Sequence, residues 1–127
     1  VEMYFDAIND GKYECFVNED TRLPMMFMDD AIRATLELMD APLDSLNYHS
    51  NYNLSSMSFS AKELANEISL HVDFECTYKP DYRQDIANTW PNSIADEDAR
   101  NDWGWEPKFD ISKMTEEMIT NLRRLNE

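Results

Sequence analysis

Glycine is scarce in this chain, which has only Gly11 and Gly104 among its 127 residues. A loop that binds phosphate groups needs several glycines close together, because backbone amides must approach the ligand closely. These two glycines are isolated, so the sequence has neither a dinucleotide-binding fingerprint nor a P-loop. We therefore expect this chain alone to bind no nucleotide cofactor.

Cysteine and histidine are scarce as well. Cys15 and Cys76 lie far apart and lack the CxxC spacing of zinc ligands, and His49 and His71 do not form a pair. Neither a zinc site nor a disulfide framework is indicated. Isolated cysteines of this kind are typical of free thiols in a cytoplasmic protein, where they pack as small apolar side chains. We expect no metal site and no catalytic thiol.

Long apolar runs are missing, so we expect neither a signal peptide nor a membrane span. Basic residues are also few, with 11 against 26 acidic ones, which gives a formal charge of -15. Such a charge repels a nucleic-acid backbone and an anionic lipid surface, so we expect neither as a partner. The acidic residues are dispersed along the chain, which favours a solvated surface over a site for cations or a basic protein.

The chain does have enough apolar residues, 43%, to form the core of one domain. Val1, Tyr4 and Phe5 already follow helical spacing, so we expect the chain to begin inside a structured element, as at a cut end. The periodicity predicts an α/β fold with about five helices. Helices are expected at residues 1–9, 29–41, 60–71, 93–103 and 110–125, and strands at residues 13–17, 23–28, 52–54 and 74–78.

Three local patterns give these predictions detail. The order of strand 52–54, a helix and strand 74–78 forms a strand-helix-strand unit, which usually means parallel pairing of its strands. Ser60 and Glu63 have the spacing of a capping box at the start of the intervening helix. Apolar spacing predicts the buried faces of two other helices, namely Ile32, Thr35, Leu36 and Met39 in one, and Met114, Met118, Ile119, Leu122 and Leu125 in the last.

Arg22 and the methionines that follow it are candidate binding residues. Met25, Met26 and Met28 alternate through the expected strand, where they pack as core filler or, as an alternative, form a flexible wall beside a substrate. Arg22, directly before them, has the chemistry to hold an anionic ligand or to pair with Asp20.

All three tryptophans lie within sixteen positions. Trp103 and Trp105 flank Gly104, which is a helix-stop signal, so both are expected to anchor packing. Trp90 stands in an irregular segment between a threonine and a proline, where a large amphipathic ring often closes a pocket. Lone histidines and adjacent acids such as Asp29 and Asp30 do not form a catalytic pair, so we expect no catalytic residue in this chain.

Several of these segments, taken in order, resemble one known family. They are RLPMMFMDD at 22–30, AT at 34–35, YNL at 52–54 leading to MSFS at 57–60, WP at 90–91, AR at 99–100 and WGW at 103–105. Together they resemble the C-terminal part of L-threonine 3-dehydrogenases of the extended short-chain dehydrogenase/reductase type, which are relatives of UDP-galactose epimerase. The resemblance covers nearly the whole chain.

The resemblance implies a substrate-side lobe spanning 1–127, without the N-terminal Rossmann domain that binds NAD. In the family, NAD-dependent oxidation of L-threonine to 2-amino-3-ketobutyrate uses a Tyr-x-x-x-Lys pair, and none of the six tyrosines here has a lysine four positions on. The resemblance further implies that Trp90 lies at the substrate cleft, while Arg22 and the strand of Met25, Met26 and Met28 support its floor. The chain is therefore expected to be inactive alone.

Two alternatives remain at this stage. The same lobe could come from a nucleotide-sugar epimerase or dehydratase, although such a site should add basic residues near Trp90, where only Arg83 and Arg100 are available. A different class is a non-catalytic interaction module. Half of a doubly wound enzyme exposes strand edges and apolar faces, which favour a homo-oligomer such as a dimer.

Overall fold

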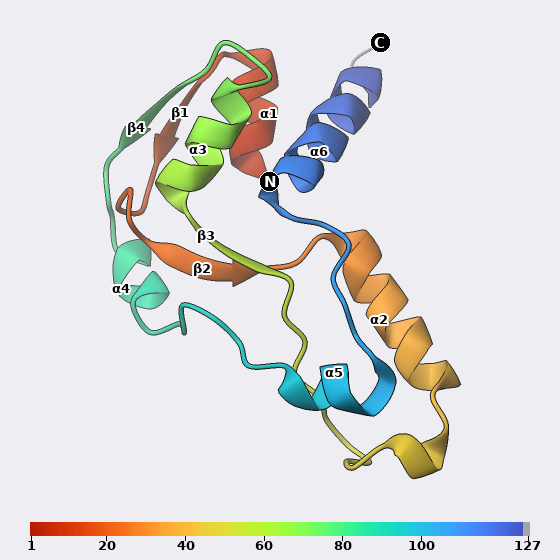
Figure 1. Cartoon of the computed structure of the whole chain (residues 1–127). Coiled ribbons are helices and arrows are strands. Elements are labelled where there is room, and N and C mark those ends of the chain that lie inside the picture. The colour runs from red at the N-terminus through yellow and green to blue at the C-terminus, as the bar shows by residue number, and fades with distance from the viewer. Residues whose placement is uncertain (126–127) are drawn as a thin grey trace.

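A computed structural model of the chain describes residues 1–125 (Figure 1). Within that range it is a mixed α/β fold of short strands, six α-helices and one 3-10 helix. The elements are α1 (Glu2–Asn9), β1 (Lys12–Cys15), β2 (Arg22–Met25), α2 (Met28–Asp40), η1 (Leu43–Ser45), β3 (Met57–Ser60), α3 (Ala61–Ser69), β4 (Glu75–Tyr78), α4 (Arg83–Ala87), α5 (Glu97–Trp103) and α6 (Ile111–Leu125).

The strands form two separate pairs. β1 and β4 are parallel, with Cys15 opposite Tyr78, and β2 and β3 are antiparallel, with Met25 opposite Met57. The strand expected at 52–54 is absent, and the strand-helix-strand order is formed instead by β3, which begins at Met57, with α3 and β4. Its two strands, however, belong to different sheets, so the predicted parallel pairing between them is wrong. The parallel partner of β4 is β1, which lies some sixty residues earlier in the chain.

Two clusters of buried side chains hold the elements together. The larger lies where α1, α3 and α6 cover the β1–β4 pair, at the upper end of Figure 1. The smaller joins α2 and α5 at the other end, where Ala34, Ala99 and Trp105 are buried. The β2–β3 pair and the segment between α5 and α6 connect the two ends (Figure 1).

Local signals at helix ends were predicted well. The Ser60 hydroxyl accepts the Glu63 amide at 3.2 Å, and the Glu63 carboxylate accepts the Ser60 amide at 2.8 Å, so the capping box is confirmed. Asp110 accepts the Lys113 amide at 2.8 Å before α6. Gly104 ends α5 with a φ of 74°, a left-handed conformation that suits glycine.

Helix faces were predicted less well. On α6, Met114, Ile119 and Leu122 are buried as expected, whereas Leu125 is exposed. On α2, the predicted buried face is wrong, because Ile32, Thr35, Leu36 and Met39 are exposed. Its buried residues are Asp30 and Ala34.

The start of α2 also differs from the prediction. The preceding strand ends at Met25, and the helix begins at Met28 with Phe27 as N-cap, so Asp29 does not cap it. Among the described residues, no helix is long and apolar enough to cross a membrane.

Candidate functional site

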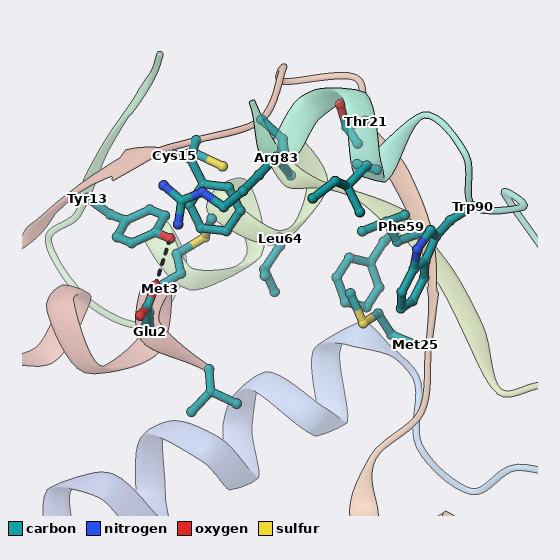
Figure 2. A pocket seen from close by; sticks show the side chains of 17 residues that line it. Glu2, Met3, Tyr13, Cys15, Thr21, Met25, Phe59, Leu64, Arg83 and Trp90 are labelled. Carbon is teal, nitrogen blue, oxygen red and sulfur yellow. Dashed lines mark hydrogen bonds between the residues drawn. The ribbon is translucent and has the colours of Figure 1, made fainter. Parts of the chain in front are cut away.

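A pocket of about 500 Å³ opens on the face formed by β1, β2 and α4. Most of its wall is apolar, with further residues from the start of α1 and from β3 and α3. Figure 2 shows Trp90, Met25 and Phe59 grouped at one end, Tyr13, Glu2 and Arg83 toward the other, and Leu64 between them. A concave, mainly apolar site with few polar groups is typical of small-molecule binding.

Trp90 forms one wall of the pocket and keeps 57% of its surface exposed. Its position depends on the end of α4, because the Trp90 amide donates to the Ala87 carbonyl at 3.1 Å. The Thr89 hydroxyl donates to the Ile86 carbonyl at 2.7 Å. Beyond it, the Ser58 hydroxyl donates to the Asn92 carbonyl and ties this segment to β3. The ring is thus held from the backbone and left open toward solvent.

Arg83 forms the polar end of the pocket. Its guanidinium lies 3.5 Å from the centre of the Phe16 ring and makes hydrogen bonds of 2.6 to 3.1 Å with the Asp81 carboxylate. These bonds raise the pKa of Arg83 and lower the pKa of Asp81. Both groups therefore stay charged near neutral pH, and their charges offset one another.

Two further groups on the wall, Tyr13 and Cys15, are not suited to proton transfer at neutral pH. Burial, followed by nearby acidic groups, raises the pKa of Tyr13 to about 12, and its hydroxyl donates to Glu2 at 3.5 Å. Burial also raises the pKa of the Cys15 thiol, which keeps it protonated. The wall can bind and shield a ligand, but these groups do not provide a general base.

Two of the five predicted site residues line this pocket, namely Trp90 and Met25. Met26 packs instead in the smaller core with Ala34 and Trp105, and Met28 is the exposed first residue of α2. The three methionines therefore do not share one strand, and the core-filler interpretation is wrong for Met25 and Met28, which are exposed.

Arg22 lies beside the pocket rather than in its wall. Its guanidinium donates to both Glu63 carboxylate oxygens at 2.6 and 2.7 Å and to the Ser58 carbonyl at 2.5 Å. The expected pairing with Asp20 is thus replaced by a bidentate pair with Glu63. Arg22 and Trp90 both line a neighbouring hollow of about 310 Å³.

Two arrangements were missed by sequence reasoning, one in the pocket wall and one on α2. Phe16 and Arg83 are 67 positions apart, and no local pattern connects them. Asp30 is fully buried and accepts the backbone amides of Lys108 at 3.0 Å and Phe109 at 3.0 Å. The adjacent acids Asp29 and Asp30 gave no signal that one of them is internal. Among the described residues, no group of three or more histidine, cysteine or acidic side chains is placed to bind a metal.

Comparisons with known proteins identify relatives over almost the whole chain, although no protein-family model matches it. The mitochondrial L-threonine 3-dehydrogenase of Bos taurus is 46% identical over 121 residues, which is 94% of this chain and 32% of that protein. A solved structure of a monomeric L-threonine 3-dehydrogenase from a metagenome is 87% identical, with a TM-score of 0.95 over all of this chain and 41% of that one. The chain matches the C-terminal part of L-threonine 3-dehydrogenases.

This match confirms the resemblance to the C-terminal part of L-threonine 3-dehydrogenases, and the structure confirms the expected α/β fold class. The chain spans only part of these relatives, namely about a third of the Bos taurus L-threonine 3-dehydrogenase and 41% of the metagenome enzyme. A protein of Staphylococcus haemolyticus described as an uncharacterized epimerase/dehydratase is 43% identical over 121 residues, 94% of this chain and 38% of that protein. The relatives of this chain thus include proteins described as L-threonine 3-dehydrogenases and a protein described as an uncharacterized epimerase/dehydratase.

Proposed function

We propose that residues 1–127 are the substrate-side lobe of an NAD-dependent L-threonine 3-dehydrogenase, and that the pocket beside Trp90 is the part of the substrate cleft that this lobe supplies. The observation that carries the proposal is an apolar pocket with the half-exposed ring of Trp90 in its wall. It occurs in a chain that is 87% identical to an L-threonine 3-dehydrogenase over all of this chain and 41% of that enzyme. Substrate binding by Trp90 with Met25 beside it belongs to this proposal, as does support of the cleft by Arg22, Met26 and Met28 from outside the pocket wall.

NAD itself does not fit the residues of this chain. Gly104 ends α5 and Gly11 follows α1, each with a positive φ, so neither glycine opens a helix N-terminus toward a pyrophosphate. We infer that NAD and the catalytic groups are supplied by an N-terminal domain. The lobe contributes binding, orientation and exclusion of water, and L-threonine oxidation requires both parts.

The proposal is tested in two steps. The purified chain, mixed with L-threonine and NAD, should give no NADH absorbance at 340 nm. A hybrid in which the chain replaces the corresponding part of the metagenome enzyme should oxidise threonine. In that hybrid, Trp90→Ala should lower kcat/KM by about 10 to 100-fold, the range expected for losing a large ring from a binding wall.

The matched control is Tyr48→Ala, because Tyr48 is also a half-exposed aromatic residue but lies outside this pocket. The control should keep kcat/KM within about twofold. Equal losses in the two variants, or turnover by the 127-residue chain alone, would contradict the proposed role.

The second candidate is the corresponding lobe of a nucleotide-sugar epimerase or dehydratase, which the Staphylococcus haemolyticus relative favours. A sugar nucleotide carries a diphosphate, and the three arginines considered for it, in the pocket wall, beside it and on α5, are each paired with an acid of this chain. Arg83 pairs with Asp81, Arg22 with Glu63, and Arg100 with Asp96. Threonine is therefore the better substrate class, and assaying the hybrid with UDP-galactose separates the two.

Assembly and location remain predictions. The metagenome relative is described as monomeric, which supports a monomer over the homo-oligomer expected from unpaired strand edges. A cytoplasmic location rests only on the two free cysteines, Cys15 and Cys76.

A further inference from the structure

Helix α4, which Trp90 follows in the chain, lies at the surface of the molecule. Each of its five residues is half-buried or exposed. A helix this short is not stable by itself, so contacts with other segments must fix its position. The Trp90 amide is bound to the Ala87 carbonyl in the last turn, and the place of the ring in the pocket wall therefore depends on those contacts.

The side chain of Gln84 joins α4 to the connection between β1 and β2. Its Oε1 atom accepts the Asn18 amide at 2.7 Å and the Thr21 hydroxyl at 3.0 Å. A backbone amide can only donate, so the carbonyl oxygen of Gln84 must face this connection. The Nε2 atom donates to Asn88 Oδ1 at 2.7 Å, one turn further along. Figure 2 shows Thr21 beside α4, and Trp90 on the segment that leaves the helix.

The connection between β1 and β2 is itself firmly held. The Thr21 carbonyl accepts the Ala61 amide at 3.2 Å, and the Glu19 carbonyl accepts the Lys62 amide at 3.0 Å. The Lys62 ammonium also lies 2.8 Å from the Glu19 carboxylate. Both partners belong to the first turn of α3, a helix of the larger core. Gln84 thus fastens a surface helix to a part of the chain that the core holds in place.

Arg83 makes the other side-chain contact between α4 and this connection, and it is less specific. Its guanidinium stacks on the Phe16 ring, while its hydrogen bonds go to Asp81, two positions earlier in the same segment. A cation over a ring is held less directionally than a pair of hydrogen bonds. The orientation of α4 is therefore set mainly by Gln84.

We propose that Gln84 is a positioning residue of the substrate site, which fixes α4 so that the Trp90 ring stays in the pocket wall. The inference rests on the proposed function. Gln84 lines the neighbouring hollow rather than the pocket, so its effect on L-threonine passes through Trp90. A wall that contacts substrate and transition state equally affects KM more than kcat.

The first experiment measures amide hydrogen exchange in the 127-residue chain. Gln84→Met keeps the size and helix propensity of the side chain but removes its hydrogen-bonding groups, and Gln84→Glu keeps an acceptor oxygen. In Gln84→Met, the Asn18 and Trp90 amides should exchange about tenfold faster, because two hydrogen bonds that hold α4 are lost. The Ile119 amide in α6 should keep its rate, which shows that the variant is folded. Gln84→Glu should restore slow exchange.

The second experiment measures kinetics in the hybrid with the metagenome enzyme. Gln84→Met should raise KM for L-threonine by roughly 5- to 20-fold and change kcat by less than about threefold. Gln84→Glu should recover most of the loss. The matched control is Asp85→Met, an exposed position on the same helix, which should stay within about twofold. Added to Trp90→Ala, Gln84→Met should change KM by less than about twofold, because its effect needs the ring.

Two results would overturn the proposal. One is an unchanged exchange rate of the Trp90 amide in Gln84→Met. The other is a rise in KM that is equally large with and without the Trp90 ring, which would give Gln84 a general structural role. A hybrid that does not oxidise threonine would refute the proposed function. The exchange rates need no substrate, so they decide separately whether Gln84 fixes Trp90.

Discussion

The buried carboxylate of Asp30 fastens α2 to the segment that leads into α6, so replacing it with alanine should be strongly destabilising. The change removes the acceptor for the Lys108 and Phe109 amides and the more deeply buried of the two acidic partners of Arg33, the other being Glu37. Hydrogen bonds to a charged group contribute about 1.5 to 3 kcal/mol each, and breaking a buried ion pair costs about 3 to 5 kcal/mol. Because these contributions overlap, we expect a loss of about 3 to 5 kcal/mol in the free energy of unfolding.

The assay is urea unfolding of the full chain, followed by tryptophan fluorescence. Trp105 is a local reporter because it is buried in the smaller core, and Arg33 lies 4.8 Å from the centre of its ring. Asp29→Ala is the control, since Asp29 is exposed, and it should change stability by less than about 0.5 kcal/mol. A loss below about 1 kcal/mol for Asp30→Ala would refute the argument that this carboxylate holds α2.

The pH dependence gives a second check on Asp30. Burial alone raises the pKa of Asp30, but the hydrogen bonds from Arg33 and from the Lys108 and Phe109 amides outweigh it, so the pKa is lowered from its usual 3.8. A lowered pKa in the folded state means that the stabilisation is fully present above the unfolded pKa and is lost as pH falls through the folded one. Below about pH 4 the unchanged chain should therefore lose stability more steeply than Asp30→Ala.

Two further substitutions test the helix ends. Ser60→Ala removes the hydroxyl that caps α3 and should cost about 1 kcal/mol in urea unfolding, whereas Ser50→Ala, in an exposed loop, should cost almost nothing; equal costs would contradict the capping role. Gly104→Ala should cost about 1 kcal/mol, because its φ is 74° but no atom lies within 4 Å of an added Cβ. Gly11→Ala should lower the free energy of unfolding by more than Gly104→Ala, because a Cβ at Gly11 would lie 3.2 Å from the Asp73 carbonyl oxygen. A larger loss for Gly104→Ala would show that this close contact does not decide the difference.

Local chemistry predicted the ends of helices, but not which side of a helix is covered. The capping box of Ser60 and Glu63 depends on residues three positions apart, so the sequence contains all of it. The apolar spacing of Ile32 and Leu36 predicted a buried face, but both side chains are exposed and the buried residues of the helix are Asp30 and Ala34. Apolar spacing does not show which side of a helix the rest of the chain covers, and in the sequence Asp30 looks like an ordinary surface acid.

Long-range partners were the other limit on prediction. The pairing of β4 with β1 and the stacking of Arg83 on Phe16 join segments more than sixty residues apart, and nothing in either segment selects the other. For the pocket, a large ring in an irregular segment was enough to predict that Trp90 lies in a pocket wall, and Trp90 does line the pocket. Trp105 was expected to anchor packing, and it is buried with its indole N–H donating to the Ser55 carbonyl at 3.0 Å.

The polar groups on the pocket wall are already bound to neighbours in the same chain. Arg83 is held by Asp81, Tyr13 donates to Glu2, and the Thr21 hydroxyl donates to the Gln84 side chain at 3.0 Å. Such a wall selects ligands by shape, and shape alone separates ligands that differ by one methylene by only about 1 to 3 kcal/mol. Under the proposed function, discrimination between threonine and other small amino acids must then come from hydrogen-bonding groups of the nucleotide-binding part, so the two halves divide selectivity as well as chemistry.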